Sequence, residues 1–184
     1  DIIYICPKFN NLKFINNTSI DDNFYKNIDF FKYFKSSKET LEDINSKKEH
    51  LRDNLRRLNK IKNIIKDKVW LDFGCGYGGL LKLADNIPKV KYGIEIMNEA
   101  CLELKKNGYL IYNDINQIKD NTIDVITLSH VIAHIANPIE LCLLLKKKLK
   151  KTGKLIIETP NSNDALYELY KCNNFKNFIS AEHL

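Results

Sequence analysis

Long apolar runs, arginine and paired cysteine motifs are what this 184-residue sequence has least of. No apolar run approaches the roughly 20 residues that a membrane-crossing helix needs, which excludes an integral membrane protein. Only three of the 29 basic residues are arginines, namely Arg52, Arg56 and Arg57. Proteins that read phosphates and bases favour the bidentate guanidinium group. We therefore attribute the net charge of +6 to a general bias toward Lys, Asn and Ile, and nucleic acid is not an expected partner.

The cysteines are odd in number and form neither a C-x-x-C pair nor a cluster with histidine. They are Cys6, Cys75, Cys101, Cys142 and Cys172. This spacing supports neither a zinc site nor a disulfide framework. Reduced thiols in a cytoplasmic protein are the expectation. A composition of 44% hydrophobic and 28% charged residues is typical of a globular domain with a core.

Residues 1–67 are expected to form an extension made of an aromatic cap and an amphipathic helix. Phe and Tyr gather between residues 24 and 34. Such a cluster needs a surface to pack on, so we expect a lid over an acceptor pocket. From about Ser37 to Asp67 apolar residues recur at helical spacing, and Ser37 or Thr40 is the expected N-cap. The apolar stripe consists of Leu51, Leu55, Leu58, Ile61 and Ile65.

Residues 68–184 alternate short apolar runs with helical patterns. The expected strands are Val69–Phe73, Lys91–Ile96, Tyr109–Tyr112, Ile123–Ser129 and Lys154–Glu158. The expected helices span about Gly79–Asn86, Asn98–Lys106 and Pro138–Lys150, with Gly108 and Gly153 at helix C-termini. This alternation predicts an α/β fold with a doubly wound, mainly parallel sheet. Ligands of such folds bind at the carboxyl ends of the strands.

The most informative segment is VWLDFGCGYGG, in which a strand runs into a glycine-rich turn and then into a helix. Gly74, Gly76 and Gly79 match G-x-G-x-x-G, so a nicotinamide or flavin dinucleotide is one candidate ligand. Asp72 argues against it, because a carboxylate at this strand end would face and repel a pyrophosphate. The same carboxylate suits the ammonium and sulfonium groups of S-adenosylmethionine. A purely structural turn is the remaining alternative.

Acidic residues also follow the next two predicted strands. Glu95 lies 23 residues after Asp72 and is able to accept hydrogen bonds from ribose hydroxyls, which serves either nucleoside cofactor. Asp114 follows the third strand, where it would accept a hydrogen bond from an adenine amino group. Each of these carboxylates taken singly is equally compatible with an ordinary surface position. Their order along the chain, each at a strand end, favours a nucleoside site.

The segment from Val69 to Asn161 resembles a class I S-adenosylmethionine-dependent methyltransferase. The matching stretches are VWLDFGCGYGG, YGIEI, YNDI, DVITLSHVIAHIANP and GKLIIETPN. The resemblance implies a Rossmann-like sheet with strand order 3-2-1-4-5, and it implies that loop residues surround the methionine part of the cofactor. The cofactor-binding residues that it implies are Asp72, Gly74, Cys75, Gly76, Gly78, Glu95, Ile96, Asp114, Ile115, Ser129 and His130.

Within this superfamily the sequence is most similar to enzymes that methylate small molecules, such as a sugar of a surface polysaccharide. Branches that methylate nucleic-acid amino groups carry an N/D-P-P-Y/F-type tetrapeptide where this chain reads Leu-Ser-His-Val. His130 and His134 are the candidate general bases, four residues apart and so on one face if that stretch is helical. Related quinone O-methyltransferases show E-x-x-E-H here, and both carboxylates are absent, so we expect no required metal.

Three further expectations concern the end of the sequence and the rival functions. Glu158, Asn161 and Asp164 follow the fifth strand, where a turn and a helix cap are favoured over a contact with substrate. The final strands usual in this superfamily are missing, so further residues or a homodimer would cover the fifth strand's edge. The alternatives to an enzyme of this class are a regulatory module that binds S-adenosylmethionine without turnover and, less favoured, an NAD-dependent oxidoreductase.

Overall fold

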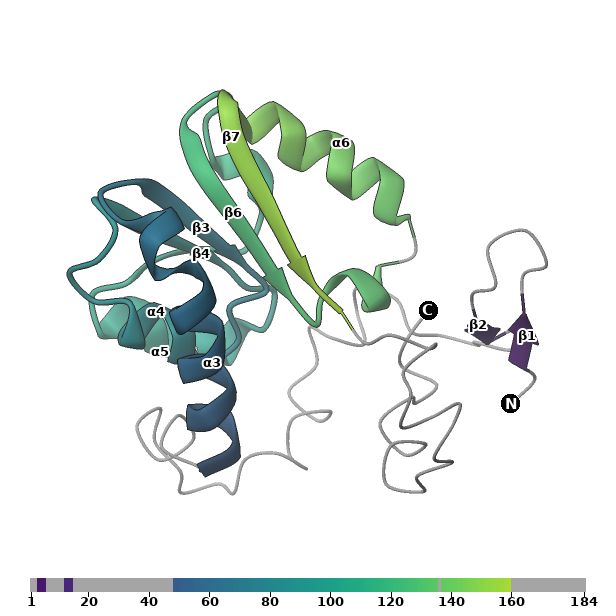
Figure 1. Ribbon diagram of the computed structural model, residues 1–184, viewed down its shortest axis with the longest axis horizontal. Helices are drawn as coiled ribbons and strands as arrows, with labels where there is room; N and C mark the ends of the chain where they lie inside the picture. Colours follow the sequence, from purple (N-terminus) through teal and green to yellow (C-terminus); the bar gives the residue numbers. More distant parts are fainter. Residues whose placement is uncertain (1–2, 6–11, 15–47, 136, 160–184) are drawn as a thin grey trace.

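The computed structural model describes residues 3–5, 12–14, 48–135 and 137–159 of the chain. The expected aromatic cap at 24–34, the N-cap candidates Ser37 and Thr40, and the positions Asn161 and Asp164 lie outside these residues. Near the N-terminus, β1 (Ile3–Ile5) and β2 (Leu12–Phe14) pair antiparallel in a two-stranded sheet (Figure 1). No helix of the described ranges is long and apolar enough to cross a membrane.

A five-stranded parallel sheet forms the centre of the fold (Figure 1). Its strands are β3 (Val69–Phe73), β4 (Val90–Ile94), β5 (Leu110–Tyr112), β6 (Ile123–Ser129) and β7 (Leu149–Glu158). They lie in the order β5-β4-β3-β6-β7, and every neighbouring pair is parallel. Counted along the chain this is the order 3-2-1-4-5, so the predicted α/β Rossmann-like fold is confirmed.

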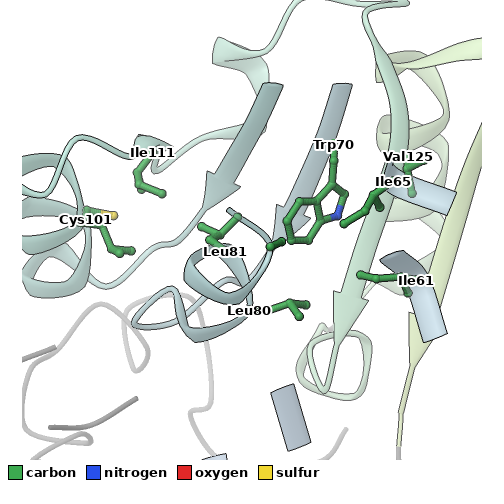
Figure 2. Packing of buried hydrophobic residues seen from close by; sticks show 10 residues of the cluster. Ile61, Ile65, Trp70, Leu80, Leu81, Cys101, Ile111 and Val125 are labelled. Atoms are coloured by element: carbon green, nitrogen blue, oxygen red, sulfur yellow. The ribbon is translucent and has the colours of Figure 1, made fainter. Parts of the chain in front are cut away.

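Helices cover both faces of this sheet (Figure 1). One face carries α3 (Lys48–Ile65), α4 (Gly79–Leu83) and α5 (Asn98–Lys106), and the other carries α6 (Pro138–Lys148) and the short 3₁₀ helices η2 (Ile115–Gln117) and η3 (Ile132–His134). Successive side chains of a strand point to opposite faces of the sheet. Trp70 therefore packs on the face covered by α3–α5, and Leu71 packs on the face covered by α6. Figure 2 shows Trp70 within the first of these layers, beside Ile65.

Helix α3 packs onto the sheet through its C-terminal half. Ile61 and Ile65 are buried against α4 and Trp70, whereas Leu51 and Leu55 are exposed. The predicted apolar stripe is therefore only partly a core stripe. The sequence pattern is the same along the helix, but among the described residues its apolar side chains reach the core cluster only from Leu58 onward.

Several element boundaries differ from those expected. Helix α4 ends at Leu83, and Asn86 takes a left-handed conformation with φ of 62° that closes the turn after it. Helix α6 stops at Lys148 because Leu149 is extended and pairs with Ile123, so Leu149 begins β7. The expectation that Gly153 ends a helix is wrong, since Gly153 lies within β7.

Other boundaries agree with the expectations or move by a residue or two. Strand β4 ends at Ile94, so Glu95 and Ile96 follow the strand instead of completing it. Gly108 does follow α5, with φ of 81° and its N–H donated to the Lys105 carbonyl. The bounds predicted for β3, β6 and α5 are those observed.

Candidate functional site

The turn between β3 and α4 is a left-handed glycine loop at the carboxyl edge of the sheet. Gly74, Gly76 and Gly78 have φ values of 75°, 53° and 73°, a region that side-chain-bearing residues rarely adopt. A Cβ on Gly74 would meet Val131 Cγ2 at 2.3 Å, so this part of the loop touches its neighbour. At Gly76 no described atom lies within 4 Å of the corresponding position. A Cβ on Gly78 would likewise meet Leu104, so the loop is packed at both ends, and among the described residues nothing covers Gly76 between them.

Hydrogen bonds tie this loop to the end of β4. The backbone N–H groups of Gly74 and Cys75 both donate to the Ile94 carbonyl, at 2.8 and 3.0 Å. The Cys75 thiol is partly buried, and its burial raises the pKa of that thiol well above its ordinary value. Cys75 thus acts in the loop as an apolar, protonated side chain.

Glu95 is buried just after β4, and its carboxylate joins the two strand ends. Oε2 accepts the Gly76 N–H at 2.7 Å, while Oε1 accepts the N–H groups of Ile96 and Met97 at 2.8 and 3.0 Å. A carboxylate has about four acceptor positions, so three are filled by backbone and about one is left on Oε2. Glu95 is able to accept one further hydroxyl donor without giving up a loop contact.

Asp72 lies near the end of β3 and is only 4% exposed. Its Oδ1 accepts the Thr127 hydroxyl at 2.7 Å, and Thr127 in turn accepts the Trp70 indole N–H at 3.0 Å. Burial raises the pKa of Asp72 to about 6, although the Thr127 hydrogen bond and the charge of Arg57 oppose the rise. The site therefore holds a carboxylate whose ionisation is costly.

The residues expected around an adenine and beside the fourth strand also reach this edge. Asp114 is exposed after β5 and is the N-cap of η2. Its Oδ1 accepts hydrogen bonds from both the backbone and the side-chain N–H groups of Asn116. Ile115 next to it is buried. The Glu95 N–H donates to the Tyr112 carbonyl at 3.0 Å, linking this corner to the glycine loop. Ser129 ends β6 on the other side of β3.

The two candidate bases occupy different local structures. His130 follows β6 with a left-handed φ of 57°, whereas His134 ends the 3₁₀ helix η3. The condition for a shared helical face is not met, because η3 begins only at Ile132 and His130 lies outside it. Burial and the charge of Arg57 lower the pKa of His130, against the opposing effect of Glu158. A neutral imidazole at the end of β6 is chemically suited to take up a proton.

Arg56 and Arg57 are functional-site candidates that the sequence reading missed. Arg56 donates from both terminal nitrogens to Glu158, at 2.7 and 2.8 Å, and Arg57 Nε donates to Glu158 Oε1 at 2.8 Å. These contacts hold the pKa of Glu158 down to about 2. The sequence indicates Glu158 only as a candidate substrate contact at the end of the fifth strand, and it does not predict this ion pair. The available signal was that the only arginines of the chain lie together on one helix.

No group of three or more His, Cys, Asp or Glu side chains within the described ranges is arranged to hold a metal ion. The absence of a metal requirement stays a prediction. The residues brought together at the carboxyl edge are the glycine loop with Glu95, Asp72 with Thr127, and His130 with Glu158.

Comparison with known proteins fits this class of fold and site. Residues 39–184 match the family described as Methyltransferase domain, and the chain therefore belongs to that family. Among curated proteins, the uncharacterized protein MJ0638 of Methanocaldococcus jannaschii is 30% identical over 113 residues, which are 61% of this chain. The chain spans about half the length of this relative, 49%.

Solved structures share the fold over most of the described chain. A SAM-dependent methyltransferase from Archaeoglobus fulgidus matches with a TM-score of 0.57 and 22% identity, covering 84% of this chain and 64% of that one. The PH0226 protein from Pyrococcus horikoshii matches with a TM-score of 0.58 and 23% identity, covering 78% of this chain and 71% of that one. At these identities the likeness establishes the fold.

Proposed function

We propose that this chain binds S-adenosylmethionine at the carboxyl edge of its sheet and transfers the methyl group to a small-molecule acceptor. The observation that carries the proposal is the hydrogen bond between the ends of β3 and β4. The Glu95 carboxylate after β4 accepts the Gly76 N–H of the left-handed glycine loop after β3. Membership of the methyltransferase domain family supports the same reading. The acceptor expected is a small molecule such as a sugar of a surface polysaccharide.

The residues present fit this cofactor. No described residue covers Gly76, which suits a ligand that lies close to the backbone, and the remaining acceptor position of Glu95 suits one ribose hydroxyl. Asp114 Oδ1 is taken by Asn116, which leaves Oδ2 to accept from an adenine amino group beside the buried Ile115. Cys75, Ile96 and Ser129 complete the proposed lining. The buried Asp72 supplies negative charge toward the cationic methionine part.

The chemistry divides between the cofactor and the chain. When bound, S-adenosylmethionine supplies a methyl group already activated by its sulfonium, and the carbon–sulfur electron pair stays on sulfur as the methyl leaves. The chain's part is to align the acceptor, exclude water and receive the acceptor's proton. We assign the proton to His130, whose lowered pKa keeps it neutral near pH 7. His134 is the second candidate.

The proposal is tested by calorimetric titration with S-adenosylmethionine, S-adenosylhomocysteine and NAD side by side. Micromolar binding of the first two and none of NAD is expected. Tight NAD binding would point to an oxidoreductase. Binding without a methylated product across sugar, polyketide and quinone-precursor acceptors would point to a regulatory module.

A matched pair of variants locates the pocket. Asp114→Asn keeps an oxygen for the Asn116 cap but places an amide donor where adenine would donate, so affinity should fall about tenfold, or ~1.4 kcal/mol. Asp67→Asn removes the same charge before β3, at the opposite edge of the sheet. Its φ of 58° suits Asn. Equal affinity of both variants would contradict the placement of adenine at β5.

A further inference from the structure

His130 is anchored to Glu158 twice. Its backbone N–H donates to the Glu158 carbonyl at 2.8 Å, and its Nε2 lies 3.3 Å from Glu158 Oε1. The residue also holds a left-handed φ of 57°, which costs energy for any side chain larger than glycine. Strand β7 therefore determines where the His130 ring lies, although the two residues are far apart in sequence.

Glu158 itself is held from helix α3. Arg56 grips both carboxylate oxygens, and Arg57 Nε donates to Oε1, the same oxygen that His130 approaches. Oε1 thus accepts from both arginines, at 2.7 and 2.8 Å, and the His130 Nε2 atom lies farther away, at 3.3 Å. The planar, always-charged guanidinium groups leave the carboxylate little freedom to rotate.

We propose that Glu158, clamped by Arg56 and Arg57, is a positioning residue that fixes the ring orientation and tautomer of His130. The inference rests on the proposed function, in which His130 receives the acceptor's proton. The proposal requires the neutral ring to carry its proton on Nε2, the nitrogen that lies 3.3 Å from Glu158 Oε1, so that the basic lone pair is on Nδ1. A carboxylate alone would orient the ring but would also favour its protonated form.

Within the described part of the chain, three charged side chains act on His130. They are Arg57 and Asp53 on α3 and Glu158 on β7. Burial and Arg57 lower the pKa of His130, while Glu158 and Asp53 raise it, and the net direction is downward. The arginine charge therefore offsets what the orienting carboxylate would otherwise do to the base.

Ring titration by ¹⁵N nuclear magnetic resonance tests this in the full chain, with the His130 signal assigned by its loss in His130→Gln. The wild type should show the Nε2–H tautomer and a depressed pKa. Arg57→Gln should raise the pKa of His130, and Glu158→Gln should lower it and weaken the tautomer preference. The two variants each remove one charge but should shift the pKa of His130 in opposite directions. A purely structural role of the ion pair would not produce this result.

Two further variants separate charge from folding. Arg57→Lys keeps the positive charge, so the pKa of His130 should stay low even if the helix contact loosens. Arg52→Gln removes one charge from the exposed surface of the same helix and should leave the His130 titration as in the wild type. A His130 pKa that is unchanged in both Arg57→Gln and Glu158→Gln, or that moves in the same direction, overturns the proposal.

The titration is performed without cofactor or acceptor, so its failure is distinct from that of the proposed function. Absence of S-adenosylmethionine binding would refute the proposed function and leave the ring titration standing. Once an acceptor is known, Glu158→Gln should lower kcat by roughly 10- to 100-fold with little change in cofactor affinity. The pH profile of Arg57→Gln should shift to higher pH, following the base.

Discussion

The buried carboxylate of Asp72 makes a specific prediction about stability and pH. Its pKa rises from an ordinary 3.8 to about 6 in the folded protein, chiefly because it is buried. A rise of this size corresponds to about 3 kcal/mol, at about 1.36 kcal/mol for each pH unit. Because the folded pKa is the higher one, Asp72 costs stability progressively as pH rises from about 4 to about 6, and the cost is constant above that.

The substitution Asp72→Asn removes this cost while keeping an oxygen that accepts the Thr127 hydroxyl. The variant should match the wild type near pH 4 and exceed it by up to about 3 kcal/mol in free energy of unfolding at pH 7 to 8. Urea denaturation at closely spaced pH values, compared as the difference between the two proteins, measures this. The same variant should bind S-adenosylmethionine more weakly, because the pocket loses its negative charge.

Asp114→Asn is the matched control, since it removes one negative charge from an exposed position at the same edge of the sheet. If it gave the same pH-dependent gain, net charge and not burial would be the cause. A difference between Asp72→Asn and wild type that is constant from pH 4 to 8, or that shrinks as pH rises, would refute the reasoning.

Two further predictions concern the loop and an ion pair in which only the lysine is buried. Gly78→Ala combines a φ of 73° with a Cβ that would lie 2.5 Å from Leu104 Cδ2, whereas Gly76→Ala meets strain alone, so the former should lose at least about 1 kcal/mol more in thermal denaturation. The Lys148 ammonium contacts Asp120 at 2.7 Å, and their side chains are 6% and 53% exposed. Lys148→Met should therefore change the free energy of unfolding by no more than about 1 kcal/mol, while Asp120→Asn should cost about 2 kcal/mol by stranding a buried charge. Equal losses of unfolding free energy from these two substitutions would show that the burial of the Lys148 ammonium does not destabilise the protein when its partner is removed.

The sequence was most informative where a local pattern and the tertiary structure agree. The runs Val69–Phe73 and Ile123–Ser129 are apolar and bounded by turn residues, and both strands form with those bounds. Helix α5 ends where its basic last turn meets Gly108. By contrast, the lysine-rich sequence pattern predicts helix through Lys150, whereas the pairing of Leu149 with Ile123 makes Leu149 and Lys150 part of a strand.

The same division applies to the site. The glycine loop and Glu95 were readable because their spacing follows from one strand–turn–helix unit and the strand after it. The burial of Asp72 was not readable, since it depends on Thr127 and on helix α3 covering that face of the sheet. The sequence identified His130 as a candidate base, but it did not predict the left-handed conformation or the orientation of this residue.

By itself the sequence determined the order of elements, the parallel sheet and the glycine loop, because hydrophobic periodicity and glycine positions act over a few residues. Tertiary structure alone decided the cluster of Arg56, Arg57 and Glu158 beside His130. The arginines precede Glu158 by 102 and 101 positions, and no local pattern relates them. They meet because α3 packs across the sheet and parallel strands bring their carboxyl ends to one edge, where charge and hydrogen-bond geometry act over a few ångströms.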